Sequence, residues 1–300
     1  MTSLSAFNQA LEETAAAVEA LLERLLPPVE GPEARVVEAM RYACLRGGKR
    51  LRPFLLLQSA ALFEVPPPRA LRAGAALEMV HCYSLVHDDL PAMDNSDLRR
   101  GRPTLHKTTD EATAILAGDG LLTEAFAVLS DPETHPDAEV RCALVAGLAA
   151  AGGTRGMVGG QMIDIAAEAG RLNLDLAELE RLQALKTGAL IAYAVDAGAV
   201  LGKAHRSDRE ALRRYAAALG LAFQIKDDIL DVESSAEELG KPAGQDAAAD
   251  KVTFVAFLGA GGAREKARAL VDEALGCLDS FGEKAEFLRK TAEFVIDRRS

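Results

Sequence analysis

The sequence predicts an all-α protein, a bundle of roughly ten or more helices around a central cavity. Apolar residues recur at the three- and four-residue spacing of amphipathic helices, and the alternation typical of strands is absent, so no strand is expected. Prolines and glycine pairs separate the periodic segments, as they do at helix ends. Two aspartate clusters interrupt helical segments that are otherwise apolar, and we expect both to face the cavity.

The composition indicates one globular domain over residues 1–300, since 49% of the residues are hydrophobic and 26% are charged. The formal net charge of −11 disfavours non-specific binding to nucleic acid. The start lacks the pattern of a signal peptide, and no uninterrupted apolar run reaches about 18 residues, so no membrane span is expected. The cysteines lack metal-ligand or redox spacing, which predicts reduced core residues of a cytoplasmic protein. They are Cys44, Cys82, Cys142 and Cys277.

Four helices should precede the first aspartate cluster. The first covers residues 4–26 and ends at a proline pair, and the second runs from about residue 33 to Gly47 and Gly48. The third has Pro53 in its first turn and ends before the prolines at 66–68. The fourth leads into the aspartates and is apolar on most faces, which is typical of a helix in the middle of a bundle.

The helices after the first cluster are expected to begin at capping residues. The candidates are Thr108 to Asp110, Asp175, and Ser207 with Glu210 as a capping box for the helix of the second cluster. Residues 233–251 lack helical periodicity and predict a flexible loop, which should close over the site together with the C-terminus. Two more helices should finish the chain.

The first cluster consists of Asp88, Asp89 and Asp94, followed by the arginines of residues 99–102. Carboxylates are ligands that Mg²⁺ prefers, and guanidinium groups match phosphate oxygens. Two of these acids are six residues apart, and Pro91 between them disfavours a continuous helix and allows the chain to bend back. The pattern favours a metal that bridges to a phosphorylated ligand, with a solvated charged loop as the alternative.

The second cluster lies at Gln224, Asp227, Asp228 and Asp231, positions that share one face of a helix. The remaining positions are largely apolar, so like charges interrupt a helix that otherwise looks buried. Such charges are costly unless cations or donors neutralise them. Two acidic helices about 140 residues apart therefore indicate Mg²⁺ ions that hold one polyanion between them.

These motifs resemble those of the isoprenyl diphosphate synthases, or trans-prenyltransferases, with the bacterial farnesyl diphosphate synthases as the most similar members. DDLPAMD is similar to the first aspartate-rich motif of that family, and DDILD to the second. Further similar segments follow in the family's order: GGKRLRP at 47–53, GGQMIDI at 159–165, LKTG at 185–188 and LGKPAGQDAAADK at 239–251. The resemblance implies a Mg²⁺-dependent head-to-tail (1'-4) condensation in isoprenoid biosynthesis. Isopentenyl diphosphate would react with dimethylallyl or geranyl diphosphate, giving mainly farnesyl diphosphate and releasing diphosphate.

The resemblance also implies roles for single residues. Three Mg²⁺ ions would be held by Asp88, Asp94 and Asp227, and the catalytic set would be Asp88, Asp89, Asp94, Asp227, Asp228 and Lys186. The allylic diphosphate would contact Arg99, Lys186, Thr187, Gln224 and Lys241. Isopentenyl diphosphate, which has no metal bridge, would contact Lys49, Arg52, His81 and Arg100. Apart from the resemblance, Gln161 and Asp164 lie three residues apart on one helix, which makes them candidates to support the metal site from outside, with simple helix polarity as the alternative.

Product length is expected to depend on Tyr83 and Ser84. The resemblance implies that an aromatic residue five positions before the first aspartate stops growth at C15. In an ideal helix Tyr83 points about 140° away from Asp88, so this role requires a tail that passes between helices or an irregular helix near Pro91. A packed core tyrosine is the alternative.

Other functions remain open at this point. C10 and C20 products are alternatives to C15. A terpene cyclase uses similar clusters, although its second motif normally mixes Asn, Ser or Thr with Glu, and a non-catalytic prenyltransferase subunit would usually lack acids from one cluster. His87 beside Asp88 resembles the His–Asp pair of metal phosphohydrolases, which need further histidines at ligand spacing. The resemblance implies a homodimer, with no stable membrane insertion.

Overall fold

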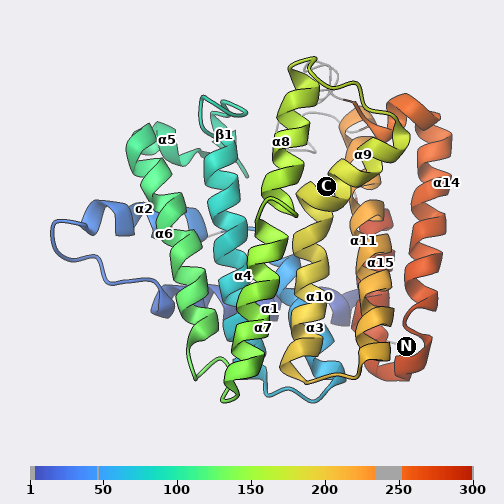
Figure 1. The fold of residues 1–300 in the computed structure, drawn as a ribbon, viewed down its shortest axis with the longest axis horizontal. Helices are drawn as coiled ribbons and strands as arrows, with labels where there is room; N and C mark the ends of the chain where they lie inside the picture. Colours follow the sequence, from blue (N-terminus) through green and yellow to red (C-terminus); the bar gives the residue numbers. More distant parts are fainter. Residues whose placement is uncertain (1–3, 46, 234–251, 299–300) are drawn as a thin grey trace.

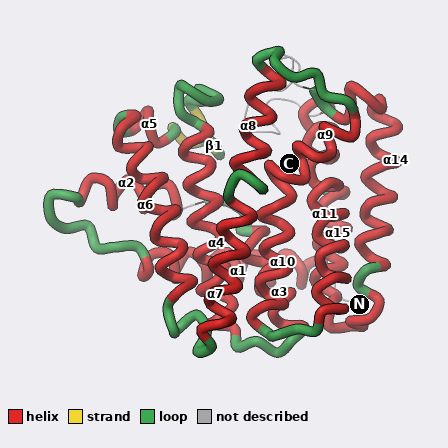
Figure 2. The backbone as a smooth tube through the Cα atoms, viewed as in Figure 1, coloured by secondary structure: helices red, strands yellow, loops and turns green. Residues whose placement is uncertain are grey.

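The computed structural model describes residues 4–45, 47–233 and 252–298. This part of the chain is a bundle of helices with one very short hairpin, which confirms the all-α prediction (Figures 1 and 2). The helices of the first half are α1 (Leu4–Leu25), α2 (Ala34–Cys44), α3 (Leu51–Leu62), α4 (Pro67–Asp88), α5 (Leu105–Thr108), α6 (Glu111–Ser130) and α7 (Ala138–Gly152). Those of the second half are α8 (Met157–Glu168), α9 (Leu176–Gln183), the π-helical turn η1 (Ala184–Gly188), α10 (Ala189–Leu201), α11 (Arg206–Glu233), α14 (Phe254–Gly276), the 3-10 turn η2 (Asp279–Ala285) and α15 (Glu286–Asp297).

Most helix ends follow the local signals in the sequence. The side chain of Asp110 accepts the Thr113 N–H at 2.8 Å and caps α6, and Asp175 forms a capping box with Glu178 at the start of α9. The predicted box at Ser207 is wrong, because α11 already begins at Arg206 and Ser207 lies inside the first turn. The predicted loop at 233–251 lies outside the described residues, apart from Glu233 at the end of α11.

A hairpin corrects the prediction that the chain holds no strand. Strands β1 (Leu98–Arg99) and β2 (Arg102–Pro103) pair antiparallel, with Arg99 opposite Arg102. The two turn residues, Arg100 and Gly101, have φ values of 52° and 72°. Tight two-residue hairpin turns require this left-handed backbone, which glycine adopts without strain. Strands of two residues are too short to produce a visible alternation.

Helix α4 runs through the middle of the bundle, as its apolar character predicts. It packs against α3, α6 and α10, and most of its length is buried. Gly198 brings α10 close to α3, because a side chain there would collide with the backbone of Leu56 and Ala60. Figure 1 shows that α4 and α11 both end at the end of the bundle where the hairpin lies. The two acidic clusters are therefore carried to the same end of the molecule.

The structure corrects one expectation about the surface. Cys142 on α7 is exposed, whereas the other three cysteines are buried, and all four are free thiols. The sequence around Cys142 is apolar because α7 carries alanines on its outer face as well as larger apolar residues on its buried face. Apolar sequence on this helix therefore does not mean burial.

Three segments of the described chain are long and apolar enough to cross a membrane by length and composition alone. They are Glu111–Ser130, Ala138–Glu168 and Leu176–Leu201. None of these segments is an uninterrupted apolar run, because charged or polar residues interrupt each of them. In the fold, the apolar 18-residue windows in these three segments are 44%, 22% and 56% buried inside the bundle, in the order given. The expectation of no membrane insertion stays a prediction.

Candidate active site

The first acidic cluster lies where α4 ends and the chain turns back on itself. Asp88 is the last residue of α4, and the N–H of Asp94 donates to the carbonyl oxygen of Asp88 at 2.9 Å. This closed turn contains Pro91, so the bend expected from the proline is present. Burial raises the pKa of Asp88 to about 6, with a further rise from Asp94, while Lys186 opposes the shift. The carboxylate therefore sits in a place that favours a nearby cation.

The neighbouring acid is held by the hairpin. Asp89 is buried and accepts hydrogen bonds from Nε and Nη2 of Arg99 at 2.8 and 2.7 Å. Burial raises the pKa of Asp89, although Arg99 works against this shift. Because Arg99 already binds a carboxylate, a diphosphate at this position would have to share the guanidinium group with Asp89. The pair fixes the hairpin over the end of α4.

The second acidic cluster occupies the last turns of α11, and its members have different surroundings. Asp227 accepts a hydrogen bond from Nη2 of Arg298 at 2.6 Å, so the C-terminal segment reaches this cluster. Asp228 is buried and accepts the N–H of Phe254 at 2.7 Å, which anchors the start of α14. Asp231 is also buried. Asp227 is thus the most accessible of the three aspartates.

A π-helical turn carries the predicted lysine and threonine between the two clusters. The turn η1 packs against α8 and α11, and Thr187 Oγ1 donates to Oε1 of Gln224 at 3.0 Å. Lys186 pairs with Asp164 on α8, and its charge also acts on Asp88. A side chain at Gly160 would collide with the backbone of Lys186, so this glycine allows α8 to approach. Such π turns often occur at functional sites, since they turn side chains out of the regular helical register.

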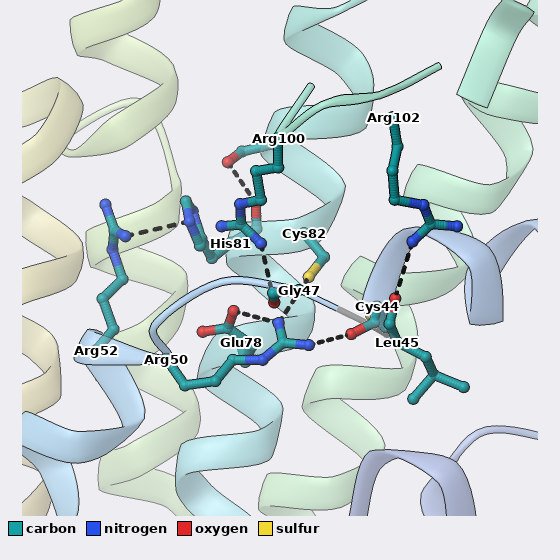
Figure 3. Close-up of polar contacts among 11 residues, drawn as sticks. Cys44, Leu45, Gly47, Arg50, Arg52, Glu78, His81, Cys82, Arg100 and Arg102 are labelled. Atoms are coloured by element: carbon teal, nitrogen blue, oxygen red, sulfur yellow. Dashed lines mark hydrogen bonds and ion pairs between the residues drawn. The ribbon is translucent and has the colours of Figure 1, made fainter. Parts of the chain in front are cut away.

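The predicted basic residues gather beside α4, as Figure 3 shows for Arg52, His81 and Arg100. Nη1 of Arg52 lies 3.2 Å from Nε2 of His81, and Arg100 donates to the carbonyl of Gly47 at 3.1 Å. Burial and the charge of Arg52 hold the pKa of His81 well below its usual range, so the imidazole is neutral and accepts from Arg52. Burial also lowers the pKa of Lys49, whose ammonium lies 5.4 Å from the ring centroid of Phe294. Arg52, His81 and Arg100 therefore form a group of basic side chains beside α4 that includes none of its aspartates.

The residues expected to control product length lie on α4 below the first cluster. Tyr83 is buried, and its ring packs edge-on against His87 at 5.6 Å. The hydroxyl of Ser84 donates to the carbonyl of His81 at 2.8 Å, a bond within its own helix. His87 Nε2 lies 3.1 Å from the carbonyl oxygen of Ile115 on α6, so this histidine serves helix packing and not a phosphohydrolase metal site. Lys241 lies outside the described residues.

The carboxylates fit a divalent metal that substrate oxygens complete. In the described part of the chain, no three His, Cys, Asp or Glu side chains are close enough to hold a metal ion by themselves. Mg²⁺ usually binds one or two carboxylates together with water and substrate phosphate, so a protein-only cage is not required. The buried carboxylate of Asp89 and the half-buried carboxylate of Asp88, both with raised pKa, match this donor chemistry.

Two residues near the site were missed in the sequence. Glu78 on α4 is a single acid within an apolar helix, and this isolation was the available signal, because a buried charge requires a partner. Its partner is Arg50, which lies within the GGKRLRP segment. Arg298 carries no comparable signal, since its contact with Asp227 depends on the packing of α15.

Comparison with known proteins identifies the family of this chain. The model of the family described as polyprenyl synthetase matches residues 33–291. Farnesyl diphosphate synthase of Geobacillus stearothermophilus is 48% identical over 86% of each chain. Farnesyl diphosphate synthase of Escherichia coli is 44% identical over 97% of this chain and 99% of its own. The crystal structure of an FPP/GFPP synthase from Zymomonas mobilis superposes with a TM-score of 0.88 at 46% identity, covering 97% of this chain and 98% of that one.

The family match, the similarity over nearly the whole length and the paired acidic clusters all point the same way. The chain belongs to the polyprenyl synthetase family.

Proposed function

We propose that the chain is a farnesyl diphosphate synthase, a prenyltransferase that joins isopentenyl diphosphate to an allylic diphosphate and releases diphosphate. One observation carries this function. Two acidic clusters lie at the same end of a helical bundle, and the side chains of Arg52, His81 and Arg100 gather beside α4, in a chain 44% identical to a named synthase over almost all its length. Two diphosphate sites of different character suit a reaction with two diphosphate substrates.

The Mg²⁺ ions would be held by Asp88, Asp94 and Asp227. The family resemblance implies three ions. Bound there, the ions would supply positive charge that neutralises the leaving diphosphate. The acids Asp89 and Asp228 already accept hydrogen bonds from Arg99 and from the start of α14, so their part is to position the two motifs.

The allylic substrate would lie between the clusters, where Lys186, Thr187, Gln224 and Arg99 can orient its diphosphate. Lys241 is proposed as a further contact on the basis of the motif alone. When the carbon–oxygen bond of the allylic substrate breaks, the electron pair leaves with the diphosphate and an allylic cation remains. Fixed cations such as Lys186 stabilise the negative charge that builds on the leaving group. The double bond of isopentenyl diphosphate then attacks the cation, and a proton lost from the adjacent carbon goes to the released diphosphate.

Isopentenyl diphosphate would bind at Lys49, Arg52, His81 and Arg100. Arg52 and Arg100 can each donate two hydrogen bonds to phosphate oxygens. His81 is neutral and adds no charge, and it holds the guanidinium of Arg52 in place. This arrangement binds a diphosphate without help from metal ions.

Incubation with isopentenyl diphosphate, each allylic diphosphate in turn and Mg²⁺, followed by product chromatography, tests the proposal. We expect farnesyl diphosphate as the main product and none in EDTA. Release of a hydrocarbon from the allylic substrate alone would indicate a terpene cyclase. A main C20 product would favour the geranylgeranyl alternative. This alternative remains open because a chloroplastic geranylgeranyl pyrophosphate synthase of Arabidopsis thaliana is 46% identical over 88% of this chain.

We also propose a cytoplasmic homodimer. Helix α6 exposes Ile115 and Leu116 with 43% and 57% of their surface open, and exposed apolar residues grouped on one helix suit a protein interface. Light scattering coupled to size exclusion would measure the mass. A 31.8 kDa species over the working concentration range would contradict the dimer.

A further inference from the structure

We infer that Arg50 and Glu78 form a positioning pair that fixes the cations of the isopentenyl diphosphate site, an inference that rests on the proposed function. Neither residue is a proposed ligand of a diphosphate. Arg50 lies between the proposed ligands Lys49 and Arg52 in sequence, yet its side chain is buried and points away from that of Arg52 (Figure 3).

The pair is buried and tightly bonded. Nη1 of Arg50 lies 2.6 Å from Oε1 of Glu78, and the two side chains are 1% and 2% exposed. Nη2 of the same guanidinium donates to the carbonyl of Cys44, the last residue of α2, at 2.5 Å. Arg50 therefore joins the end of α2, the start of α3 and the middle of α4.

The backbone at this point needs such an anchor. Gly47 and Gly48 precede the segment, and Gly48 has a φ of 89°. Arg50 itself has a φ of 50°, a left-handed conformation that residues other than glycine seldom adopt. The buried side chain can hold this backbone in place. Lys49 and Arg52 leave the chain on either side of Arg50, so its orientation determines where both point.

Helix α4 supplies two partners one turn apart. Glu78 holds Arg50, and His81, three residues further, contacts Arg52 at 3.2 Å. Residues three apart on a helix lie on the same face. The start of α3 is therefore fixed against one face of α4 at two points. The first point is fully buried, and the second borders the proposed ligand.

A change in the charge of the pair can distinguish a positioning role from simple electrostatic attraction of the substrate. Glu78 neutralises Arg50, so the positive charge open to a diphosphate resides on Lys49, Arg52 and Arg100. Replacing Glu78 by Gln removes a negative charge near these cations. If attraction alone mattered, this change would strengthen the binding of isopentenyl diphosphate. If geometry matters, it weakens binding, because a neutral amide holds the guanidinium of Arg50 less firmly than a carboxylate does.

A purely structural role is a further alternative, since breaking a buried ion pair also costs stability. Replacing both partners by apolar residues of similar size is often neutral for stability. The double variant Arg50→Met/Glu78→Leu therefore keeps the fold while it removes the connection between α2, α3 and α4. Glu78→Asp keeps the charge and shortens the side chain, which tests distance alone.

The experiment measures separate KM values for isopentenyl and geranyl diphosphate, together with the melting temperature, for the full chain. We expect Glu78→Gln, Glu78→Asp and the double variant each to raise the KM for isopentenyl diphosphate about tenfold or more. The KM for geranyl diphosphate should stay within about twofold, because its proposed ligands lie on η1, α11 and the hairpin. Arg209→Met/Asp196→Leu is the control, a half-buried ion pair at 2.8 Å between α11 and α10. It should leave both KM values unchanged.

Three results would overturn the inference. The first is a lower KM for isopentenyl diphosphate in Glu78→Gln, which would show that charge dominates. The second is an equal rise for both substrates, and the third is a normal KM in a double variant that melts at the wild-type temperature. An inactive wild-type chain would instead refute the proposed function, so the two failures are distinguishable.

Discussion

Asp88 combines a ligand position with an unfavourable charge. Its carboxyl is half-buried near Asp94, and desolvation raises its pKa to about 6. The folded state therefore holds a proton that the unfolded state releases between about pH 4 and 6, and the free energy of unfolding falls as the pH rises through this range.

In EDTA at pH 7, Asp88→Asn should therefore be more stable than the wild type by about 1 to 2 kcal/mol, a value reduced for partial solvent access. The gain should vanish below about pH 4, where both forms are neutral at this position. Urea unfolding at several pH values measures it. An equal difference at pH 4 and pH 7 would show that the charge of Asp88 is not responsible.

Loss of a proposed metal ligand should abolish turnover without unfolding the protein. We expect Asp88→Ala and Asp227→Ala each to lower kcat at least about a thousandfold at saturating Mg²⁺, because the charge on the leaving group is no longer neutralised. Asp97→Ala removes an exposed acid from the nearby loop and serves as the control. Near-normal turnover in either variant would refute the metal-ligand assignment.

The two cation sites should be separable by kinetics. Lys49→Ala and Arg52→Ala should mainly raise the KM for isopentenyl diphosphate, because no metal shares its charge. Lys186→Ala should act mainly on the allylic substrate, since Lys186 lies near Asp88. Initial rates with each substrate varied in turn decide this. Equal effects of all three variants on both substrates would mean that the sites are not distinct.

At the scale of the helices, the sequence predicted what local signals determine and missed what packing determines. Prolines, glycine pairs and the Asp175 cap placed most of the helix ends. The hairpin and the π turn were not predicted, because each depends on contacts with distant segments. The bond of Arg50 to Glu78 spans 28 residues. A single acid in an apolar helix indicates a buried charge, but the sequence does not indicate which residue pairs with it.

Helix α4 should also determine product length. Tyr83 is buried, and burial raises the pKa of its hydroxyl. Tyr83 also lies close enough to Asp88 for the charge of Asp88 to raise this pKa further. Tyr83→Ala should open space beside the hydrocarbon tail and shift the products from C15 to C20 or longer. Product chromatography of a folded, active variant measures the shift.

Ser84→Ala provides the comparison, because the Ser84 hydroxyl bonds within its own helix and its loss should leave the products unchanged. An unchanged C15 distribution in Tyr83→Ala would place the end of the tail site elsewhere and favour the packed-core interpretation of this tyrosine.

For the whole molecule, the metal should bind tightly only together with a diphosphate. The described residues form no protein-only metal cluster, so Mg²⁺ alone should hardly change the melting temperature. Mg²⁺ with inorganic diphosphate at about a hundredfold excess over its Kd should stabilise the fold by about 2.7 kcal/mol. Thermal melts with each component alone and with both test this, and a full shift with Mg²⁺ alone would contradict it.

The π turn makes the chain length at this point a fixed quantity. A π turn has one residue more than the α-helical path would use, and deletion of one residue from 184–188 would restore regular hydrogen bonding from α9 into α10. Each residue turns an α-helix by about 100°, so the deletion would rotate Lys186 away from Asp164 or turn the buried face of α10 out of the core. A conservative substitution in residues 184–188 can keep this geometry, but the deletion of a single residue cannot. A regular α-helix at this point would lose the π turn and, with it, the position of Lys186 in the site.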